Sequence, residues 1–481
     1  MSNQVTNKIM LITYADSLGK NLAELTEVLK NHVGEAVGGL HILPFFPSSA
    51  DRGFAPITYR EVDEAFGSWE DIDRLSQQYY LMYDYMINHI SAHSREYQDY
   101  LANKDQSEYR DFFIRFRDFW PNGEPTKEEL ERIYKRKDGG PSVEAKFADG
   151  TKEKIWSTFC DEQIDLDMNQ PKVKTFIREN LEFMAGHGAA LIRLDAFGYA
   201  TKKPGTSCFF LEPEVWDLLA ESRDILKPYG IEVLPEIHEN YFTQLRLDAR
   251  GYYTYDFALP LLVLHALYFA DSLYLKNWLK ICPRRQFTTL DTHDGIGVMD
   301  AYHLLQDDDI RKTLEHLFQI SPRSRSISTK SSHTYFDAYQ INCSYYSALG
   351  EDDDRYLTAR AIQFFTPGIP QVYYMGMLAG VNDCELLEKT GEGRDINRRY
   401  YTKEQVKKEV ERPVVQKLLR MMRFRNTHPA FDGELEILDC GLDQLSLRWT
   451  KDRHMARLDA DLTEGKFEIT YTGADDVVLT L

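Results

Sequence analysis

Cysteine is scarce in this chain. Six cysteines are spread over 481 residues, and no two of them form a C-x-x-C pair. Disulfide frameworks and structural zinc sites need thiols in paired, close spacing. We therefore expect six reduced thiols in a protein of the cytoplasm.

Long apolar runs are absent as well. No uninterrupted apolar segment approaches the roughly 20 residues of a membrane helix, and the mean hydropathy is -0.46. Residues 1–17, MSNQVTNKIMLITYADS, have an apolar core too short for a secretory signal and no small-residue cleavage site. These features predict a cytoplasmic protein with no membrane partner.

Basic residues are outnumbered. Lys and Arg total 57 against 76 Asp and Glu, which gives a net charge of -19. Such an acidic surface disfavours nucleic acid as a partner, and an anionic substrate would need a local basic patch. No metal-ligand cluster and no glycine-rich nucleotide loop is found, so we predict no metal and no cofactor. The sequence leaves open whether the protein is a monomer or a homodimer.

Short β-rich runs alternate with helical patterns along most of the chain. The predicted strands are 8–14, 38–44, 80–87, 190–195, 231–236, 252–257, 286–291 and 369–374. The clearest predicted helices are 21–32, 172–188 and 212–226. Eight such repeats predict an α/β fold, a (β/α)8 TIM barrel. A doubly wound open sheet would alternate in the same way, but usually with fewer strands.

Two long excursions interrupt the alternation, and it stops near residue 427. We predict a barrel formed by 1–95, 169–295 and 356–426, with inserted loop subdomains at 96–168 and 296–355. ELEILDC, LSLRWT and KFEITYT predict a small C-terminal antiparallel β domain over 427–481.

The segment LIRLDAFGYA, residues 191–200, places an arginine and an aspartate inside a predicted strand. Arg193 and Asp195 are two residues apart, so their side chains point to the same side. A guanidinium beside a carboxylate lowers the pKa of that carboxylate. The pattern therefore favours Asp195 as an anionic nucleophile, although a single Arg-x-Asp pair is more often an internal ion pair.

A second carboxylate follows another predicted strand. Glu236 comes after the apolar IEVLP, and partial desolvation there would raise its pKa towards that of a general acid. Retaining glycoside chemistry requires such a pair, with the carboxyl groups about 5 Å apart. Asp294 would hold sugar hydroxyls and stabilise positive charge on the ring, with His89 and His293 as hydrogen-bond donors. Several such groups at the carboxyl ends of barrel strands indicate an active site.

Four segments resemble a known family. DYMINH, IRLDA, LPEIHE and LDTHDG resemble, in order, the four signature segments of the α-amylase superfamily, glycoside hydrolase family 13. LPFFPSSADRGFAP, GTSCFFLEPE, PGIPQVYYMGMLAG and EGRDINRRYY resemble its sucrose phosphorylase branch. The resemblance implies Asp195 as nucleophile, Glu236 as acid/base and Asp294 as transition-state stabiliser.

The same resemblance implies a set of binding residues. Those that would contact the glucosyl ring or flank the nucleophile are Asp51, Phe54, His89, Arg193, Tyr199, His293 and Arg398. Those of the loop that would meet fructose or phosphate are Asp337, Tyr339 and Gln340, in FDAYQ. Arg136 and Lys137, in YKRKDG, lie where the family presents a basic residue to phosphate, although without the resemblance this run reads equally well as a solvated loop.

The implied activity is glucosyl transfer from sucrose to inorganic phosphate, giving α-glucose 1-phosphate and fructose by double displacement. Two departures bear on the substrate. Arg399 replaces the histidine common after the INR arginine, and loop 321–333 carries Arg323, Arg325 and Lys330. Arg399 is an extra cation near the glucose end, whereas the loop cations favour sucrose 6-phosphate. Ala338 in FDAYQ, where relatives that use that sugar tend to have histidine, favours sucrose.

Other readings stay open. Glucosylglycerol and glucosylglycerate are further glucosyl donors used in this branch. A plain α-glucosidase or transglucosidase would use water or another sugar as acceptor. A catalytically inactive sugar-binding barrel is disfavoured because all three catalytic carboxylates are present.

Overall fold

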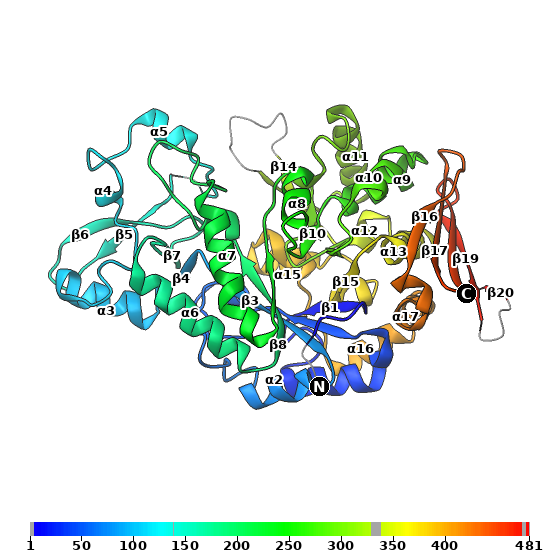
Figure 1. Cartoon of the computed structure of the whole chain (residues 1–481), viewed down its shortest axis with the longest axis horizontal. Coiled ribbons are helices and arrows are strands. Elements are labelled where there is room, and N and C mark those ends of the chain that lie inside the picture. Colours follow the sequence, from blue (N-terminus) through cyan, green and yellow to red (C-terminus); the bar gives the residue numbers. More distant parts are fainter. Residues whose placement is uncertain (1–3, 138, 329–337, 474–477, 481) are drawn as a thin grey trace. The chain divides into compact units, whose positions relative to one another are not determined.

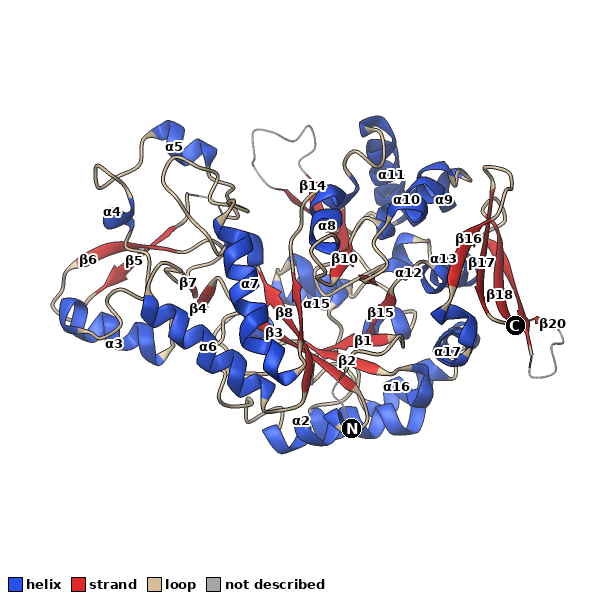
Figure 2. Ribbon diagram, in the orientation of Figure 1, coloured by secondary structure: helices blue, strands red, loops and turns tan. Residues whose placement is uncertain are grey.

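The structure, a computed structural model, describes residues 4–137, 139–328, 338–473 and 478–480. Its framework is an eight-stranded parallel sheet (Figures 1 and 2). The strands are β1 Met10–Thr13, β2 Gly39–Ile42, β3 Tyr80–Met86, β8 Ala189–Asp195, β9 Glu232–Pro235, β10 Thr254–Asp256, β11 Gln286–Thr288 and β15 Ile369–Tyr373. Neighbours follow the order β10-β11-β15-β1-β2-β3-β8-β9. Each predicted strand is present, and the predicted (β/α)8 barrel fold is confirmed.

Four of the barrel strands are buried along their whole length. Every residue of β1, β2, β3 and β15 is buried. Strands of a parallel sheet are covered on both sides, so they read as continuous apolar runs instead of alternating ones. A charged side chain in such a strand therefore needs a partner inside the protein.

Helices separate the strands in the sequence. The predicted helix at 21–32 is α1 Leu22–Val28 followed by a π-turn, 172–188 is α6 Pro171–Ala185, and 212–226 is α7 Glu214–Leu226. The others before residue 300 are α2 Trp69–Ser76, α3 Arg95–Asn103, α4 Phe116–Phe119, α5 Lys127–Arg132, α8 Tyr241–Asp248, α9 Leu259–Phe269 and α10 Leu273–Ile281. Those after it are α11 Asp307–Ile320, α12 Tyr345–Ala348, α13 Asp353–Phe365, α14 Tyr374–Met377, α15 Cys384–Thr390, α16 Lys403–Val410 and α17 Pro413–Thr427.

The chain forms two compact units, and the first consists mainly of Ile42–Ile237. It contains the parallel run β3-β8-β9, with α6 and α7 side by side (Figure 2). Two antiparallel pairs lie in its 89–165 segment: β4 His89–Ser91 with β7 Gln163–Asp165, and β5 Ser142–Lys146 with β6 Lys152–Trp156. This segment contributes most of a separate aromatic core, which includes Phe116, Trp120 and Trp156.

The second unit consists of Thr6–His41, His238–Ser328 and Ala338–Leu481. It contains the parallel run β10-β11-β15-β1 and a three-stranded sheet of β12 Ile296–Gly297, β14 Ala338–Asn342 and β13 Arg325–Ser328. Its antiparallel C-terminal sheet, orange to red in Figure 1, consists of β16 Glu434–Ile437, β17 Gln444–Lys451, β18 His454–Asp461, β19 Lys466–Thr472 and β20 Val478–Thr480. The predicted C-terminal β segments correspond to β16, β17 and β19.

The structure bears on two predictions made for the whole chain, reduced cysteines and no membrane helix. The six cysteines all lie in the described residues and are free thiols. None of the described helices combines the length and the apolar character needed to cross a lipid bilayer.

Candidate active site

A buried arginine organises the carboxylates of the first unit. Arg193 and Asp195 share a face of β8, and the register of β3 with β8 places Asp84 opposite Arg193. Arg193 Nη1 donates to Asp195 Oδ1 at 2.8 Å and also to Asp84 Oδ1, while Nη2 lies 3.5 Å from Glu236 Oε1. The Arg193 side chain is 3% exposed, and Asp84 is fully buried. The cation in the strand is therefore explained by three carboxylates that surround it.

Glu236 directly follows β9 and is held by the turn after β8. Its Oε2 accepts the backbone N–H of Ala196 at 3.0 Å, and its own N–H donates to the carbonyl of Leu194 at 3.0 Å. Ala196 has a left-handed φ of 52° in the turn that follows β8. The predicted nucleophile and acid/base thus lie in one hydrogen-bonded network. Their predicted opposite pKa shifts stay a prediction.

Asp51 and Phe54 lie on a loop of the same unit, and His89 begins β4. His89 Nε2 donates to the Phe54 carbonyl at 2.9 Å, and its Nδ1 lies 3.3 Å from Asn88 Nδ2. Burial lowers the pKa of His89, so the ring is neutral near pH 7. Asp51 begins the turn Asp51–Gly53 with a φ of 48°, and a Cβ on Gly53 would meet the Pro44 carbonyl at 2.5 Å.

The two phosphate candidates differ in their surroundings. Arg136 Nη1 donates to the Tyr199 hydroxyl at 3.3 Å, and its guanidinium lies 5.8 Å from the Phe159 ring centre and 5.9 Å from that of Tyr199. Lys137 Nζ instead pairs with Asp161 at 3.0 Å and donates to Ser157. Both line a small cavity together with Tyr134, Tyr199 and Lys202.

Lys202 is a residue that the sequence reasoning missed. Its Nζ is surrounded by Asp165 Oδ2 at 2.8 Å, Asn88 Oδ1 at 2.7 Å and the Tyr199 carbonyl at 2.6 Å, and the side chain is 3% exposed. This ammonium ties β7, the end of β3 and the turn that carries Tyr199 into one cluster. No local pattern in YATKKPG distinguishes Lys202 from Lys203, so the sequence offers no signal for it.

Asp294 and its neighbours form the site residues of the second unit. Asp294 Oδ1 lies 3.2 Å from Arg394 Nη2 and 3.9 Å from Arg398 Nη2, while Oδ2 lies 3.3 Å from His293 Nε2. Arg398 also donates to the His293 carbonyl at 3.1 Å. The structure therefore brings the predicted Asp294, His293 and Arg398 together and adds Arg394. That residue belongs to EGRDINRRYY, so its proximity could have been suspected.

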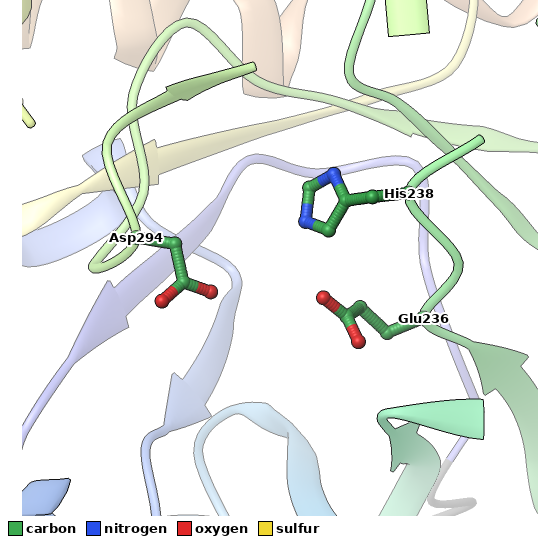
Figure 3. Close-up of side chains that lie close together, drawn as sticks. All are labelled: Glu236, His238 and Asp294. Carbon is green, nitrogen blue, oxygen red and sulfur yellow. The ribbon is translucent and has the colours of Figure 1, made fainter. Parts of the chain in front are cut away.

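His238 lies beside Asp294. A ring nitrogen of His238 and a carboxylate oxygen of Asp294 are within 4.8 Å of each other (Figure 3). His238 Nδ1 bonds to Asp300 Oδ2 at 3.1 Å, and Nε2 to Gln340 Nε2 at 3.0 Å. Because both ring nitrogens are engaged, a metal ion would have to displace one of these partners. The predicted Tyr339 and Gln340 are buried here, whereas Asp337 lies outside the described residues.

Arg399 and the cations of loop 321–333 have partners of their own. Arg399 Nε lies 3.7 Å from Asp383, and Arg323 lies 3.3 Å from Glu388. Arg325 Nη1 donates to the carbonyls of residues 323 and 324. Lys330 lies outside the described residues.

The fold and these clusters define a (β/α)8-barrel enzyme that acts on glycosidic bonds. Residues 25–249 match the α-amylase catalytic domain family. A sucrose phosphorylase of Streptococcus mutans serotype c is 51% identical over 470 residues, 97% of this chain and 98% of that protein. A glucosylglycerol phosphorylase of Marinobacter adhaerens is 44% identical over 98% of this chain and 97% of its own.

A solved structure agrees with these relatives. The crystal structure of sucrose 6F-phosphate phosphorylase from Thermoanaerobacter thermosaccharolyticum matches with a TM-score of 0.96 and 43% identity, covering 100% of this chain and 99% of that chain. The chain therefore belongs to the α-amylase family and, within it, to the group of sucrose phosphorylases and their phosphorylase relatives.

Proposed function

We propose that this protein transfers the glucosyl group of sucrose to inorganic phosphate, releasing fructose and α-glucose 1-phosphate. The observation that carries the proposal is the single guanidinium of Arg193, which lies beside both Asp195 and Glu236. Two carboxyl groups held by one rigid cation suit the paired roles of retaining glycoside chemistry.

In the first step Asp195 attacks the anomeric carbon of the glucosyl group. The bond from that carbon to the fructosyl oxygen breaks, the proton of Glu236 goes to that oxygen, and fructose leaves. The products of the step are a β-glucosyl ester on Asp195 and an ionised Glu236. Arg193, through its 2.8 Å hydrogen bond, stabilises Asp195 as an anion before the attack and as a leaving group afterwards.

In the second step a phosphate oxygen attacks the same carbon. The ester bond breaks, Asp195 regains its negative charge, and a proton carried by the attacking phosphate passes to Glu236. Two inversions restore the α configuration. Asp294, which accepts contacts from two arginines and a histidine, would stabilise the positive charge that develops on the ring in both steps.

The glucosyl ring would be held by the predicted Asp51, Phe54, His89, Arg193, Tyr199, His293 and Arg398. For His89 this proposal has a structural condition. His89 Nε2 donates its hydrogen to the Phe54 carbonyl. A sugar hydroxyl that accepts from Nε2 must therefore replace this carbonyl or share the hydrogen with it. Asp337, Tyr339 and Gln340 would meet fructose or phosphate.

Arg136 is the stronger of the two phosphate candidates. Its guanidinium lies over two aromatic rings and lines the same cavity as Tyr199, whereas Lys137 is neutralised by Asp161. A dianion can outcompete water only where cations orient it and solvent is excluded. The net charge of -19 makes such a local cluster necessary.

Sucrose 6-phosphate is the second candidate donor, and the TM-score of 0.96 to a sucrose 6F-phosphate phosphorylase favours it. The partners already held by Arg323 and Arg325 weigh against it. Glucosylglycerol and glucosylglycerate are the next candidate donors, and hydrolysis of the glucosyl ester is the remaining alternative reaction. Six free thiols support a cytoplasmic setting, with the protein a monomer or a homodimer.

The reaction run in reverse separates the donors. The purified protein is incubated with glucose 1-phosphate and, in turn, fructose, fructose 6-phosphate, glycerol or glycerate, and phosphate release is measured. Fastest phosphate release with fructose supports sucrose as the donor. Fastest release with another acceptor would show that the donor is the glucoside of that acceptor instead. Sucrose is then supplied with and without phosphate. Free glucose appearing equally fast in both would overturn phosphorolysis.

A further inference from the structure

His238 has an unusually complete set of contacts. Its ring stacks on Phe257, with centroids 4.3 Å apart, and meets Tyr339 edge-on at 5.4 Å. Its two nitrogens bond to Asp300 and Gln340, both of which are at least 97% buried. The ring is thus fixed in position and in orientation, beside Asp294 (Figure 3).

The contacts define where the proton of His238 lies. A carboxylate only accepts, so Nδ1 carries the hydrogen that Asp300 receives. Gln340 Nε2 is a donor, so the other ring nitrogen, His238 Nε2, offers its lone pair to that amide. The ring is therefore neutral in this arrangement. Gln340 Oε1 is buried and has no hydrogen-bond partner among the described residues, so its capacity to accept a hydrogen bond is unused.

The backbone brings the same partners together. Gly297 of β12 pairs with Gln340 of β14, and Asp300 lies in the turn Met299–Ala301 that follows β12. A Cβ on Gly297 would lie 3.0 Å from Asp300 Oδ2 and 2.9 Å from the Phe257 carbonyl. Glycine at 297 therefore allows the Asp300 carboxylate to approach the ring.

We infer that Asp300 is a positioning residue for the acceptor side of the proposed transfer, on which this inference rests. Asp300 keeps the hydrogen of His238 on Nδ1, and the protonation of Nε2 then decides which end of the Gln340 amide faces the ligand. With His238 neutral, Gln340 presents Oε1. With His238 protonated, Nε2–H takes Oε1 as its acceptor, and Gln340 presents its NH2 group.

The two orientations match the two ligands that must occupy this place in turn. A carbonyl oxygen accepts hydrogen bonds from the hydroxyls of fructose. An NH2 group donates to phosphate oxygens, and an imidazolium beside it adds positive charge. The Asp300 carboxylate stabilises that imidazolium at a short distance. Phosphate binding would therefore favour protonation of His238, and protonation of His238 would favour phosphate binding. Fructose would bind with His238 neutral.

Other charged groups also bear on His238. Asp294 lies within 4.8 Å and favours the protonated ring. Glu236 and Glu239 are close in the chain, and Glu239 receives hydrogen bonds from Thr243 and Asn240. Phe257, Tyr339 and Gln340 bring no charge. Asp300 is distinguished by its direct bond to Nδ1.

The test replaces Asp300 with asparagine, which can still accept the hydrogen of Nδ1 but carries no charge. Phosphorolysis of sucrose is compared with the exchange of labelled fructose into sucrose, measured without phosphate. Asp300→Asn should lower kcat/KM for phosphate at least tenfold and change fructose exchange less than threefold. Asp307→Asn, an exposed substitution at the start of α11, is the matched control and should leave both reactions unchanged.

The pH dependence gives a second readout. At each pH the rate of Asp300→Asn is divided by that of the wild type, which cancels the titration of phosphate itself. Without the carboxylate, His238 is protonated only at lower pH. The phosphorolysis rate of Asp300→Asn should therefore approach that of the wild type as the pH falls. Equal losses in phosphorolysis and exchange, or no loss, would overturn the inference.

Nitrogen chemical shifts of the histidine rings test it independently of any variant. In the wild-type protein at neutral pH without phosphate, His238 should carry its hydrogen on Nδ1, and finding it on Nε2 alone would contradict the inference. If the wild type makes no glucose 1-phosphate, the proposed function fails instead, and the tautomer measurement still reports on Asp300.

Discussion

Arg193 Nη1 lies 2.8 Å from Asp195 Oδ1 on one face of β8, and the same guanidinium lies 3.5 Å from Glu236 through Nη2. A planar group with several fixed donors can hold two carboxylates at once in a set geometry, which a lysine cannot. The separation of the two reacting groups therefore depends on one buried side chain.

Replacing Asp195 with asparagine should abolish transfer while preserving the fold. The amide oxygen can still accept from Arg193, but it cannot form the glucosyl ester, so we expect a loss of at least about 10³-fold in kcat. Glucose 1-phosphate formation and thermal melting are measured. Asp217→Asn, exposed on α7, is the control. Ordinary turnover in Asp195→Asn would remove the nucleophile assignment.

Replacing Arg193 with methionine should destabilise the protein strongly. Asp84, Asp195 and Glu236 would lose their shared cation, and breaking a buried ion pair costs about 3–5 kcal/mol. Denaturant unfolding measures the change. Lys174→Met removes a half-exposed pair with Glu221 and should cost no more than about 1 kcal/mol. Similar stabilities of the two variants would show that the carboxylates do not depend on Arg193.

The buried pair of Lys202 and Asp165 should make stability depend on pH. Burial by itself would raise the pKa of Asp165, but the Lys202 charge and its hydrogen bonds outweigh burial and lower it. A carboxylate with a lowered pKa in the folded state contributes stability above its unfolded pKa of about 3.9. That stability is lost as the pH falls through the folded value.

Lys202→Met should therefore cost about 3–5 kcal/mol at pH 7, because it leaves Asp165 charged and unpaired. The difference from the wild type should narrow as the pH falls, because burial without the cation raises the pKa of Asp165 in the variant, so that its carboxyl is protonated above about pH 4. It should narrow further below about pH 4, where the wild type loses the stability that its ionised Asp165 contributes. Unfolding curves at pH 7 and pH 3.5 measure it. Lys203→Met, one residue away and exposed, should differ little from the wild type at either pH. A gap that widens in acid would contradict this account.

Gly295→Ala should disturb the turn that presents His293 and Asp294. Gly295 has a φ of 99°, and a Cβ there would lie 2.2 Å from the Ile341 carbonyl. Gly251 has a similar φ of 78° but open space around it, so Gly251→Ala carries the backbone strain alone, about 1 kcal/mol. We expect Gly295→Ala to lose at least about 2 kcal/mol more, and most activity. Equal effects would show that the turn adapts.

Arg394→Ala should lower kcat/KM for sucrose at least tenfold without changing the melting temperature, because Asp294 loses the cation 3.2 Å away. Arg399→Ala is the matched variant. Arg399 pairs with Asp383 and is more exposed, so its removal should change kcat/KM less than threefold. Steady-state kinetics decide between them, and a larger effect at Arg399 would reverse the assignment.

Much of the fold and of the catalytic chemistry could be predicted from the sequence. The barrel strands are short runs rich in apolar, aromatic and β-branched residues, so all eight were found within a few residues. Strand β18 was missed although Ala456, Leu458 and Ala460 alternate with polar residues there. The apolar positions of HMARLDAD include the weakly apolar alanines, so its alternation of apolar and polar residues is less distinct than that of β17.

The polar residues at strand ends could also be predicted from the sequence, because an apolar strand that contains Arg193 or ends in Asp195 has to bury charge. The partners of these groups could not be predicted. A lysine or arginine side chain reaches several ångströms in any direction, and its partner is chosen by elements far away in the chain. Lys202 meets Asp165, Lys137 turns to Asp161, and Arg394 approaches Asp294 more closely than the predicted Arg398 does.

The sequence by itself determined the barrel, the pairing of Arg193 with Asp195 on one strand face, and the three carboxylates that could act on a sugar. These depend on local periodicity, which a strand imposes on its own residues. Only the tertiary structure decided that Asp84 and Glu236 share the Arg193 cation, and that Asp300 and Gln340 bind opposite nitrogens of His238. Such contacts arise where strands and turns distant in sequence meet, and local periodicity carries no information about them.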